Sequence, residues 1–135
     1  MGIIFLILGS VFVGIASLIH FAIFYFESVV WAKPATWKRF GLTSQEDAET
    51  VKPMALNQGF YNAFLGLAGF VGVILVAVPG MQQAGLTLMI YATLSKLLAA
   101  TVLITSNPKL ARAAALQGTA PLLAVIFLAV ALFVS

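Results

Sequence analysis

Cysteine is absent from this sequence, histidine occurs once, and charged residues are few. Without cysteine the chain forms neither disulfides nor thiolate metal ligands, and one histidine argues against a zinc site within a single chain. We therefore expect no metal and no other cofactor. Charged residues make up 8% of the chain, whereas soluble domains carry about a quarter. Water is thus not expected to be the main solvent of this protein.

What the chain has instead is four long apolar runs, at residues 3–31, 54–78, 83–105 and 111–133. A helix of about twenty apolar residues crosses the roughly 30 Å hydrocarbon core of a bilayer. The segments between the runs contain prolines, glycines and charges that interrupt transmembrane helices. The sequence therefore predicts an all-α integral membrane four-helix bundle, a single transmembrane domain over residues 1–135 that is surrounded by the lipid bilayer.

Positive charge exceeds negative charge, with seven Lys and Arg against four Asp and Glu. The basic side chains of the first loop are Lys33, Lys38, Arg39 and Lys52, and those at the third loop are Lys109 and Arg112. Because Lys and Arg gather in cytoplasmic loops, the first and third loops are predicted to be cytoplasmic and both termini to lie outside. No basic surface interleaved with aromatic side chains is present, so nucleic acid is not an expected partner.

The first loop, predicted at residues 32–53, adjoins aromatic side chains that suit a membrane interface. Trp31, Trp37 and Phe40 are combined with basic residues, which is typical of a short helix lying at the level of the headgroups. A solvated loop with the same aromatic side chains as interface anchors explains the pattern equally well.

Polar side chains inside the apolar runs are the candidates for function, because ionisable groups within a bilayer are costly and usually face the bundle interior. At 100° per residue, His20 and Glu27 share one face of the first run. A rise of about 1.5 Å per residue places the candidates about 6 to 16 Å from the cytoplasmic helix ends. The complete set of candidates for a ligand or proton site is His20, Glu27, Asn57, Gln58, Tyr61, Asn62, Lys96 and Gln117.

These groups come from four helices and lie in one half of the membrane, which predicts a pocket open toward the cytoplasm or the inner leaflet. Each group also has a structural explanation. Glu27 and Lys96 can extend toward the headgroups, His20 can be a neutral packing residue, and carboxamides often only join helices. The agreement in face and depth favours a shared site.

The motif Asn57-Gln58-Gly59-Phe60-Tyr61-Asn62, together with His20, Glu27 and the pair Gln117-Gly118, gives the chain a resemblance to a known family. It resembles a widespread bacterial family of small four-helix membrane proteins of unknown function that carry the pattern Asn-Gln-Gly-x-Tyr-Asn. The resemblance covers nearly the whole chain. It implies a four-helix fold and a multi-pass location in the bacterial inner (cytoplasmic) membrane, and it implies no established activity.

Three functions stay open. The first is binding or transport of a small hydrophobic or amphipathic molecule, in which Glu27 with His20 exchanges a proton or pairs a cationic group. Because four helices are few for a permeation path, transport predicts a homodimer. The second is a membrane-embedded isomerase or epimerase that uses His20 and Glu27 as acid and base on a lipid-soluble substrate. The third is an accessory subunit of a larger membrane complex. The pattern ranks binding or transport first and leaves open whether the protein is an enzyme.

Overall fold

The computed structural model describes residues 2–134, which form helices and their connections. In chain order these are α1 (Gly2–Phe24), the π turn η1 (Tyr25–Val29), α2 (Pro34–Trp37), the 3-10 turn η2 (Lys38–Phe40), α3 (Gln45–Val76), α4 (Gln82–Ser106), the 3-10 turn η3 (Pro108–Leu110) and α5 (Ala111–Phe133). Four stretches are long and apolar enough to span a membrane, namely Gly2–Val29, Gln45–Val76, Gln82–Ser106 and Pro108–Phe133. The predicted all-α fold with four apolar spans is confirmed.

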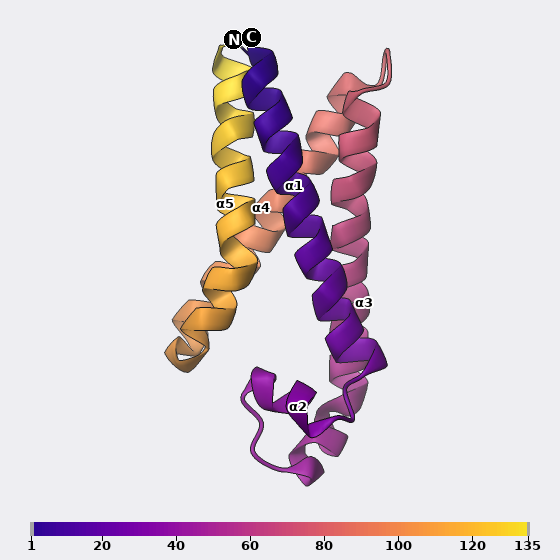
Figure 1. Ribbon diagram of the computed structural model, residues 1–135, viewed down its shortest axis with the longest axis vertical. Coiled ribbons are helices and arrows are strands. Elements are labelled where there is room, and N and C mark those ends of the chain that lie inside the picture. The colour runs from indigo at the N-terminus through magenta and orange to yellow at the C-terminus, as the bar shows by residue number, and fades with distance from the viewer. Residues whose placement is uncertain (1, 135) are drawn as a thin grey trace.

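The long helices form a ring in which each helix packs against two neighbours. α1 packs against α3 and α5, and α4 packs against the same two helices (Figure 1). The two termini and the turn between α3 and α4 lie at one end of the bundle, whereas α2 and the turn between α4 and α5 lie at the other. At this second end the helices α4 and α5 spread away from α1 and α3.

Glycines let the backbones of α3 and α4 touch. A Cβ placed on Gly85 would lie 2.8 Å from the Cα of Val76, and one on Gly72 would lie 2.9 Å from the backbone nitrogen of Met89. Small residues at such contacts allow the close packing that holds helices together in an apolar solvent. The buried apolar core beside this contact consists of Val13, Met89, Ala124 and Leu128.

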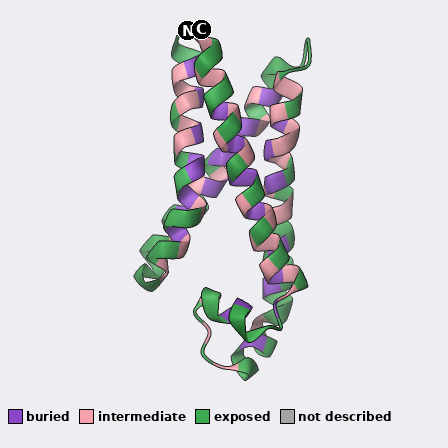
Figure 2. Ribbon diagram, in the orientation of Figure 1, coloured by how far each residue is buried: buried purple, intermediate pink, exposed green. Residues whose placement is uncertain are grey.

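The outer faces of the long helices are apolar and exposed. Figure 2 places the buried residues on the inward faces of these helices and the exposed residues mainly on their outward faces. Large exposed side chains include Ile3, Phe64, Tyr91 and Leu98. A soluble monomer rarely exposes apolar surface so continuously, and lipid covers such a surface in a membrane protein.

The predicted loop of residues 32–53 is wrong at its end, because α3 already begins at Gln45. Ser44 caps this helix, and its Oγ accepts a hydrogen bond from the backbone nitrogen of Asp47 at 3.1 Å. Pro53 lies inside the helix rather than before it. Proline is tolerated in these first turns because they precede the apolar part of the span, where water can bond the carbonyl that proline leaves without a donor.

Trp31 and Trp37 are buried in protein, with 6% and 4% of their surface exposed, rather than facing headgroups as predicted for interface anchors. They form a small second core with Ala48 and Ala55 of α3. The indole nitrogen of Trp31 donates a hydrogen bond to the carbonyl of Ala48 at 2.9 Å, and that of Trp37 donates to Oε1 of Gln45 at 3.1 Å. The early start of α3 explains the difference, since it supplies the surface that covers both indoles.

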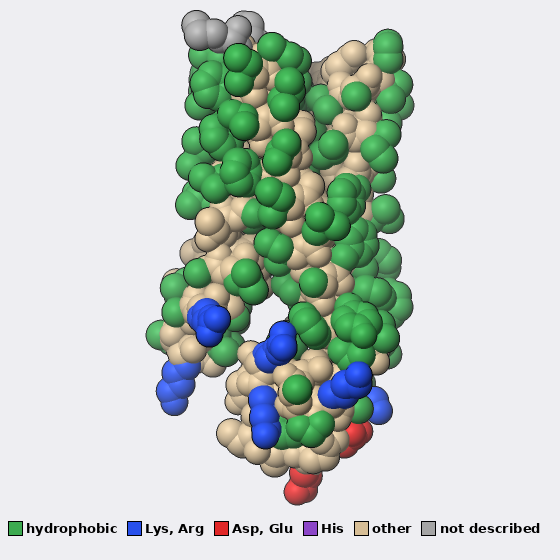
Figure 3. All heavy atoms as spheres, viewed as in Figure 1, with side chains coloured by type: hydrophobic (Ala, Val, Ile, Leu, Met, Phe, Trp, Pro, Cys, Tyr) green, Lys and Arg blue, Asp and Glu red, His purple; other side chains and the backbone are tan. Residues whose placement is uncertain are grey.

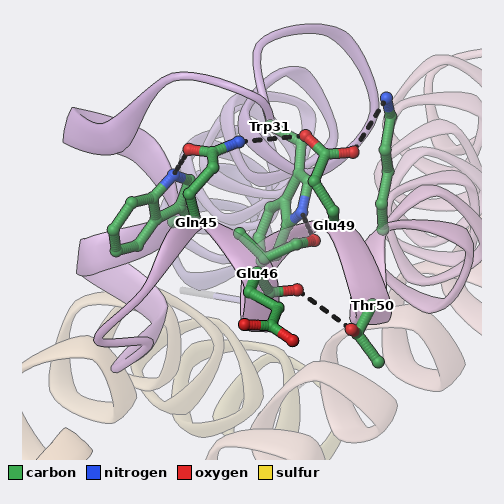
Figure 4. A network of polar contacts seen from close by, with 8 residues as sticks. Trp31, Gln45, Glu46, Glu49 and Thr50 are labelled. Carbon is green, nitrogen blue, oxygen red and sulfur yellow. Dashed lines mark hydrogen bonds and ion pairs between the residues drawn. The ribbon is translucent and has the colours of Figure 1, made fainter.

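Polar contacts at the start of α3 surround this second core (Figure 4). Nε2 of Gln45 donates to Oε1 of Glu49 at 2.9 Å, and Oε2 of Glu49 lies 3.6 Å from Nζ of Lys52. Phe40, the third predicted anchor, is half-buried and packs on Trp31 with 5.3 Å between ring centroids. The segment from α2 to the first turns of α3 is therefore a folded cap at one end of the bundle.

Candidate functional site

A cavity of about 570 Å³ lies where the long helices spread apart, beside the folded cap. We call it the Glu27 cavity. Figure 3 shows the molecule hollowed here, between the lower part of α5 and the rest, with Lys and Arg side chains beside the opening. Sites for small molecules measure about 300 to 1,000 Å³ and are mostly apolar with a few polar groups. The polar residues of the lining are Glu27, Arg39, Gln58, Asn62 and Gln117, and the apolar ones are Ile19, Ile23, Phe40, Ala99, Val102, Leu103, Leu110, Ala113 and Leu116.

Glu27 is the acidic group of this cavity, and only 7% of its surface is exposed. It lies in η1, where the α-helical pattern changes to a π turn with a hydrogen bond of 3.1 Å from the backbone nitrogen of Val30 to the carbonyl of Tyr25. A π turn contains more residues than an α turn and is frequent at functional sites. The spacing of 100° that put His20 and Glu27 on one face therefore holds only as far as Phe24.

Helix α3 holds the carboxyl group of Glu27 in place. Nδ2 of Asn62 donates a hydrogen bond to Oε2 of Glu27 at 2.9 Å and another to the backbone carbonyl of Gln58 at 3.1 Å. The two bonds fix the orientation of the Asn62 amide. Among residues 2–134, Oε1 of Glu27 accepts no hydrogen bond, so this oxygen is free to accept one from a ligand.

Gly59 accounts for the short distance between η1 and α3. A Cβ placed on Gly59 would lie 3.1 Å from the Cβ of Glu27 and would overlap the Oγ of Ser28. Three residues of the motif that begins at Asn57 therefore have separate structural roles. Gly59 gives the close approach, Gln58 lines the cavity, and Asn62 binds Glu27.

Arg39 brings a positive charge to the same cavity, although its sequence position predicts only a topology signal and a part in an interfacial helix. The chain turns there through η2 and Gly41, which has a φ of 84° in the left-handed region. Nε of Arg39 donates to the carbonyl of Ala35 at 3.2 Å, and the guanidinium lies 4.9 Å from the centroid of the Phe26 ring. The sequence feature that could have identified Arg39 as a cavity residue is its position next to Phe40, a predicted interfacial residue that lines the same cavity.

The two opposite charges of the Glu27 cavity are not paired with each other. Among residues 2–134, the ion pair present joins Lys52 to Glu49 at 3.6 Å. The terminal guanidinium nitrogens of Arg39 likewise have no hydrogen-bond partner in the described part of the chain. The cavity therefore offers both an acceptor on Glu27 and donors on Arg39.

A second group of polar side chains lies in the bundle core, outside the lining of the cavity. Lys96 has no exposed surface, and its Nζ donates to Oγ of Ser17 at 3.0 Å. His20 is 1% exposed, and its Nδ1 lies 2.9 Å from the carbonyl of Ala16. Because a carbonyl only accepts, this geometry assigns the proton to Nδ1. Gly69 leaves room for the amine, since a Cβ there would lie 3.2 Å from Nζ.

The structure divides the predicted set of candidates into three places. Glu27, Gln58, Asn62 and Gln117 line the cavity, and His20 and Lys96 lie in the core. Asn57 and Tyr61 are exposed on the outside of α3. Each of these last two precedes a cavity residue by one position, and one step along a helix turns a side chain by about 100°. Their neighbours reach the cavity, and they do not.

Comparison with known protein families identifies the family of this chain. The family described as "Protein of unknown function (DUF1304)" matches residues 14–129. This chain belongs to that family. The predicted resemblance to a family of unknown function is thereby confirmed. Searches of curated proteins and of solved structures found no match.

The DUF1304 match includes the whole polar lining of the Glu27 cavity, from Glu27 in η1 to Gln117 in α5. It also includes the core residues His20 and Lys96.

Proposed function

We propose that this DUF1304 protein is a multi-pass protein of the bacterial inner membrane that binds a small amphipathic molecule in the Glu27 cavity. One observation carries the proposal: a carboxyl group lies in the wall of a mostly apolar cavity, on a stretch long and apolar enough to span a membrane. An ionisable group in such a place is costly unless it has a partner. Asn62 occupies one carboxyl oxygen, and a ligand with a hydrogen-bond donor occupies the other.

The cavity opens toward the cytoplasm in this proposal, and both termini lie outside. The basic residues other than the buried Lys96 lie beside or within the cap, in η3 and in the first turn of α5, all at the cavity end. Cytoplasmic loops carry an excess of Lys and Arg. The ligand therefore enters from the cytoplasm or from the inner leaflet.

Binding is supported better than catalysis or transport by a single chain. The acid–base alternative needs His20 and Glu27 at one substrate, but His20 does not line the cavity. Transport needs a path through the other half of the bundle, where Val13, Met89 and Leu128 are packed without exposed surface or nearly so. A transport function consequently requires a homodimer or a large rearrangement, whereas binding requires neither.

The test is native mass spectrometry of the protein released gently from its own membranes. Four samples are compared: wild type, Glu27→Gln, Gln58→Ala and the control Asn57→Ala. Asn57 belongs to the same motif as Gln58 but does not line the cavity. We expect a defined small-molecule adduct on wild type and on Asn57→Ala, and a loss of about tenfold or more in the adduct on the two cavity variants.

Two results would contradict the proposal. One is a wild-type protein without any adduct, and the other is an adduct that all four samples retain equally. A partner protein that remains bound in every sample would favour the accessory-subunit function instead. The melting temperature of each variant, followed by circular dichroism, separates lost binding from lost folding.

A further inference from the structure

The charged groups that line the Glu27 cavity indicate the charge of its ligand. Glu27 and Arg39 line the same cavity and do not form an ion pair with each other. A pair of opposite charges in one cavity would neutralise each other if their positions allowed it. Here the carboxyl is bonded by Asn62, while the guanidinium contacts the carbonyl of Ala35 and the ring of Phe26. Each group therefore has partners of its own and is available to a ligand.

We propose that the ligand is a zwitterionic amphiphile, with an ammonium group for Glu27, an anionic phosphate or carboxylate for Arg39, and an apolar body. This inference rests on the proposed function and specifies its ligand. A carboxylate oxygen without a partner accepts a hydrogen bond from an ammonium, and a guanidinium fork binds a phosphate or a carboxylate with two parallel bonds. Gln58 and Gln117 add neutral donors and acceptors to the same lining.

The remaining lining fits the apolar part of such a molecule. Ile19 and Ile23 continue the wall along α1 away from Glu27, and Val102 and Leu103 face the cavity from α4. The volume of about 570 Å³ exceeds what a headgroup alone fills and leaves space for part of a lipid chain. Arg39 belongs to the cap, whereas Ile19 and Ile23 lie within a potential span. The charged end of the ligand therefore lies toward the cap and its apolar end toward the bundle.

Two sources supply this chemistry. A bilayer aminophospholipid such as phosphatidylethanolamine carries the phosphate, the ammonium and the apolar chains. A free apolar amino acid carries a carboxylate, an ammonium and an apolar side chain. The cavity lies at the end of the bundle where lipid headgroups are expected, and the lipid is the source that we favour.

The experiment measures binding of short-chain lipids to the full-length protein in detergent, by native mass spectrometry. The probes are dihexanoyl phosphatidylethanolamine, and dihexanoyl phosphatidylcholine, whose quaternary nitrogen cannot donate a hydrogen bond. Glycerophosphoethanolamine, which has no chains, and free phenylalanine test the water-soluble source. We expect wild type to prefer the ethanolamine lipid over the choline lipid by about tenfold or more, and to bind both water-soluble probes more weakly.

The variants assign each charge to its part of the ligand. Glu27→Gln keeps the shape of the side chain and should abolish the preference between the two lipids. Arg39→Gln should weaken both lipids by about tenfold. Lys38→Gln is the matched control, because Lys38 precedes Arg39 but lies over the ring of Trp37, at 5.6 Å, outside the cavity lining. This control should bind both lipids as wild type does.

Equal binding of the two lipids by wild type would overturn the ammonium assignment. Equal effects of Arg39→Gln and Lys38→Gln would overturn the anion assignment and leave only general surface charge. If the adduct from native membranes depends on Glu27 but is not a zwitterion, this inference fails while the proposed function stands. If no probe binds and the native protein carries no adduct, both fail.

Discussion

Lys96 is fully buried in the bundle core, whereas lysine side chains in proteins are mostly exposed. Its side chain has no exposed surface, and within residues 2–134 its amine makes one hydrogen bond, to Ser17. A Lys ammonium has three hydrogens to donate. Burying a cation with so few partners costs folding free energy. Because Lys96 does not line the Glu27 cavity, the proposed ligand does not compensate this cost.

We expect Lys96→Met to raise the free energy of unfolding by about 1 kcal/mol or more and to leave the native adduct in place. Methionine fills a similar elongated space without a charge, and the freed Ser17 hydroxyl can bond a carbonyl one turn earlier in α1. Thermal unfolding in detergent measures the change. The companion variant Ser17→Ala removes the bond of the amine and keeps the amine itself, so it should lower stability. A destabilised Lys96→Met protein would mean that the amine stabilises the core, whereas a folded variant without the adduct would give the amine a functional role.

At the scale of elements, the contact between α3 and α4 depends on the missing side chain of Gly85. A Cβ there would lie 2.8 Å from the Cα of Val76 and 2.8 Å from the carbonyl oxygen of Gly72, both backbone atoms of α3. Backbone cannot rotate away as a side chain can, so the two helices must separate. We expect Gly85→Ala to lower the free energy of unfolding by about 1 to 3 kcal/mol.

The chain offers a matched control for this prediction. Gly14 lies within α1, and a Cβ placed on it meets nothing within 4 Å. Gly14→Ala should therefore leave the melting temperature unchanged or raise it slightly, because alanine is the better helix former. If the two variants melt at the same temperature, the close contact between α3 and α4 does not stabilise the bundle.

At the scale of the whole molecule, the proposed orientation in the membrane rests on the location of the basic residues at the cavity end. The chain contains no cysteine, so a single introduced cysteine is a unique target for a maleimide that does not cross membranes. We expect the reagent to label Met81→Cys, in the turn between α3 and α4, on intact cells. It should label Lys109→Cys, at the cavity end, only after the membrane has been opened. The reverse result would contradict the proposed opening toward the cytoplasm.

The sequence alone determined the environment of this protein and the positions of its long helices. Few charges and four long apolar runs leave a bilayer as the environment, because backbone groups in hydrocarbon must bond within a helix. Part of the site also follows from local sequence. Glu27 and Asn62, both predicted candidates, lie in contact, and Gly59 between the predicted candidates Gln58 and Tyr61 makes the close approach.

Only the tertiary structure decided which polar groups meet. Helical periodicity gives the face of a side chain but not the neighbour that the face meets, and the π turn at η1 changes the register on which that periodicity depends. His20 and Lys96 consequently lie in the core while Glu27 lies in the cavity. Arg39 reaches the same cavity from the cap, because the chain folds back at Gly41 and the buried indoles fix the cap against α3. Contacts between segments far apart in the chain depend on packing in three dimensions, which no local pattern records.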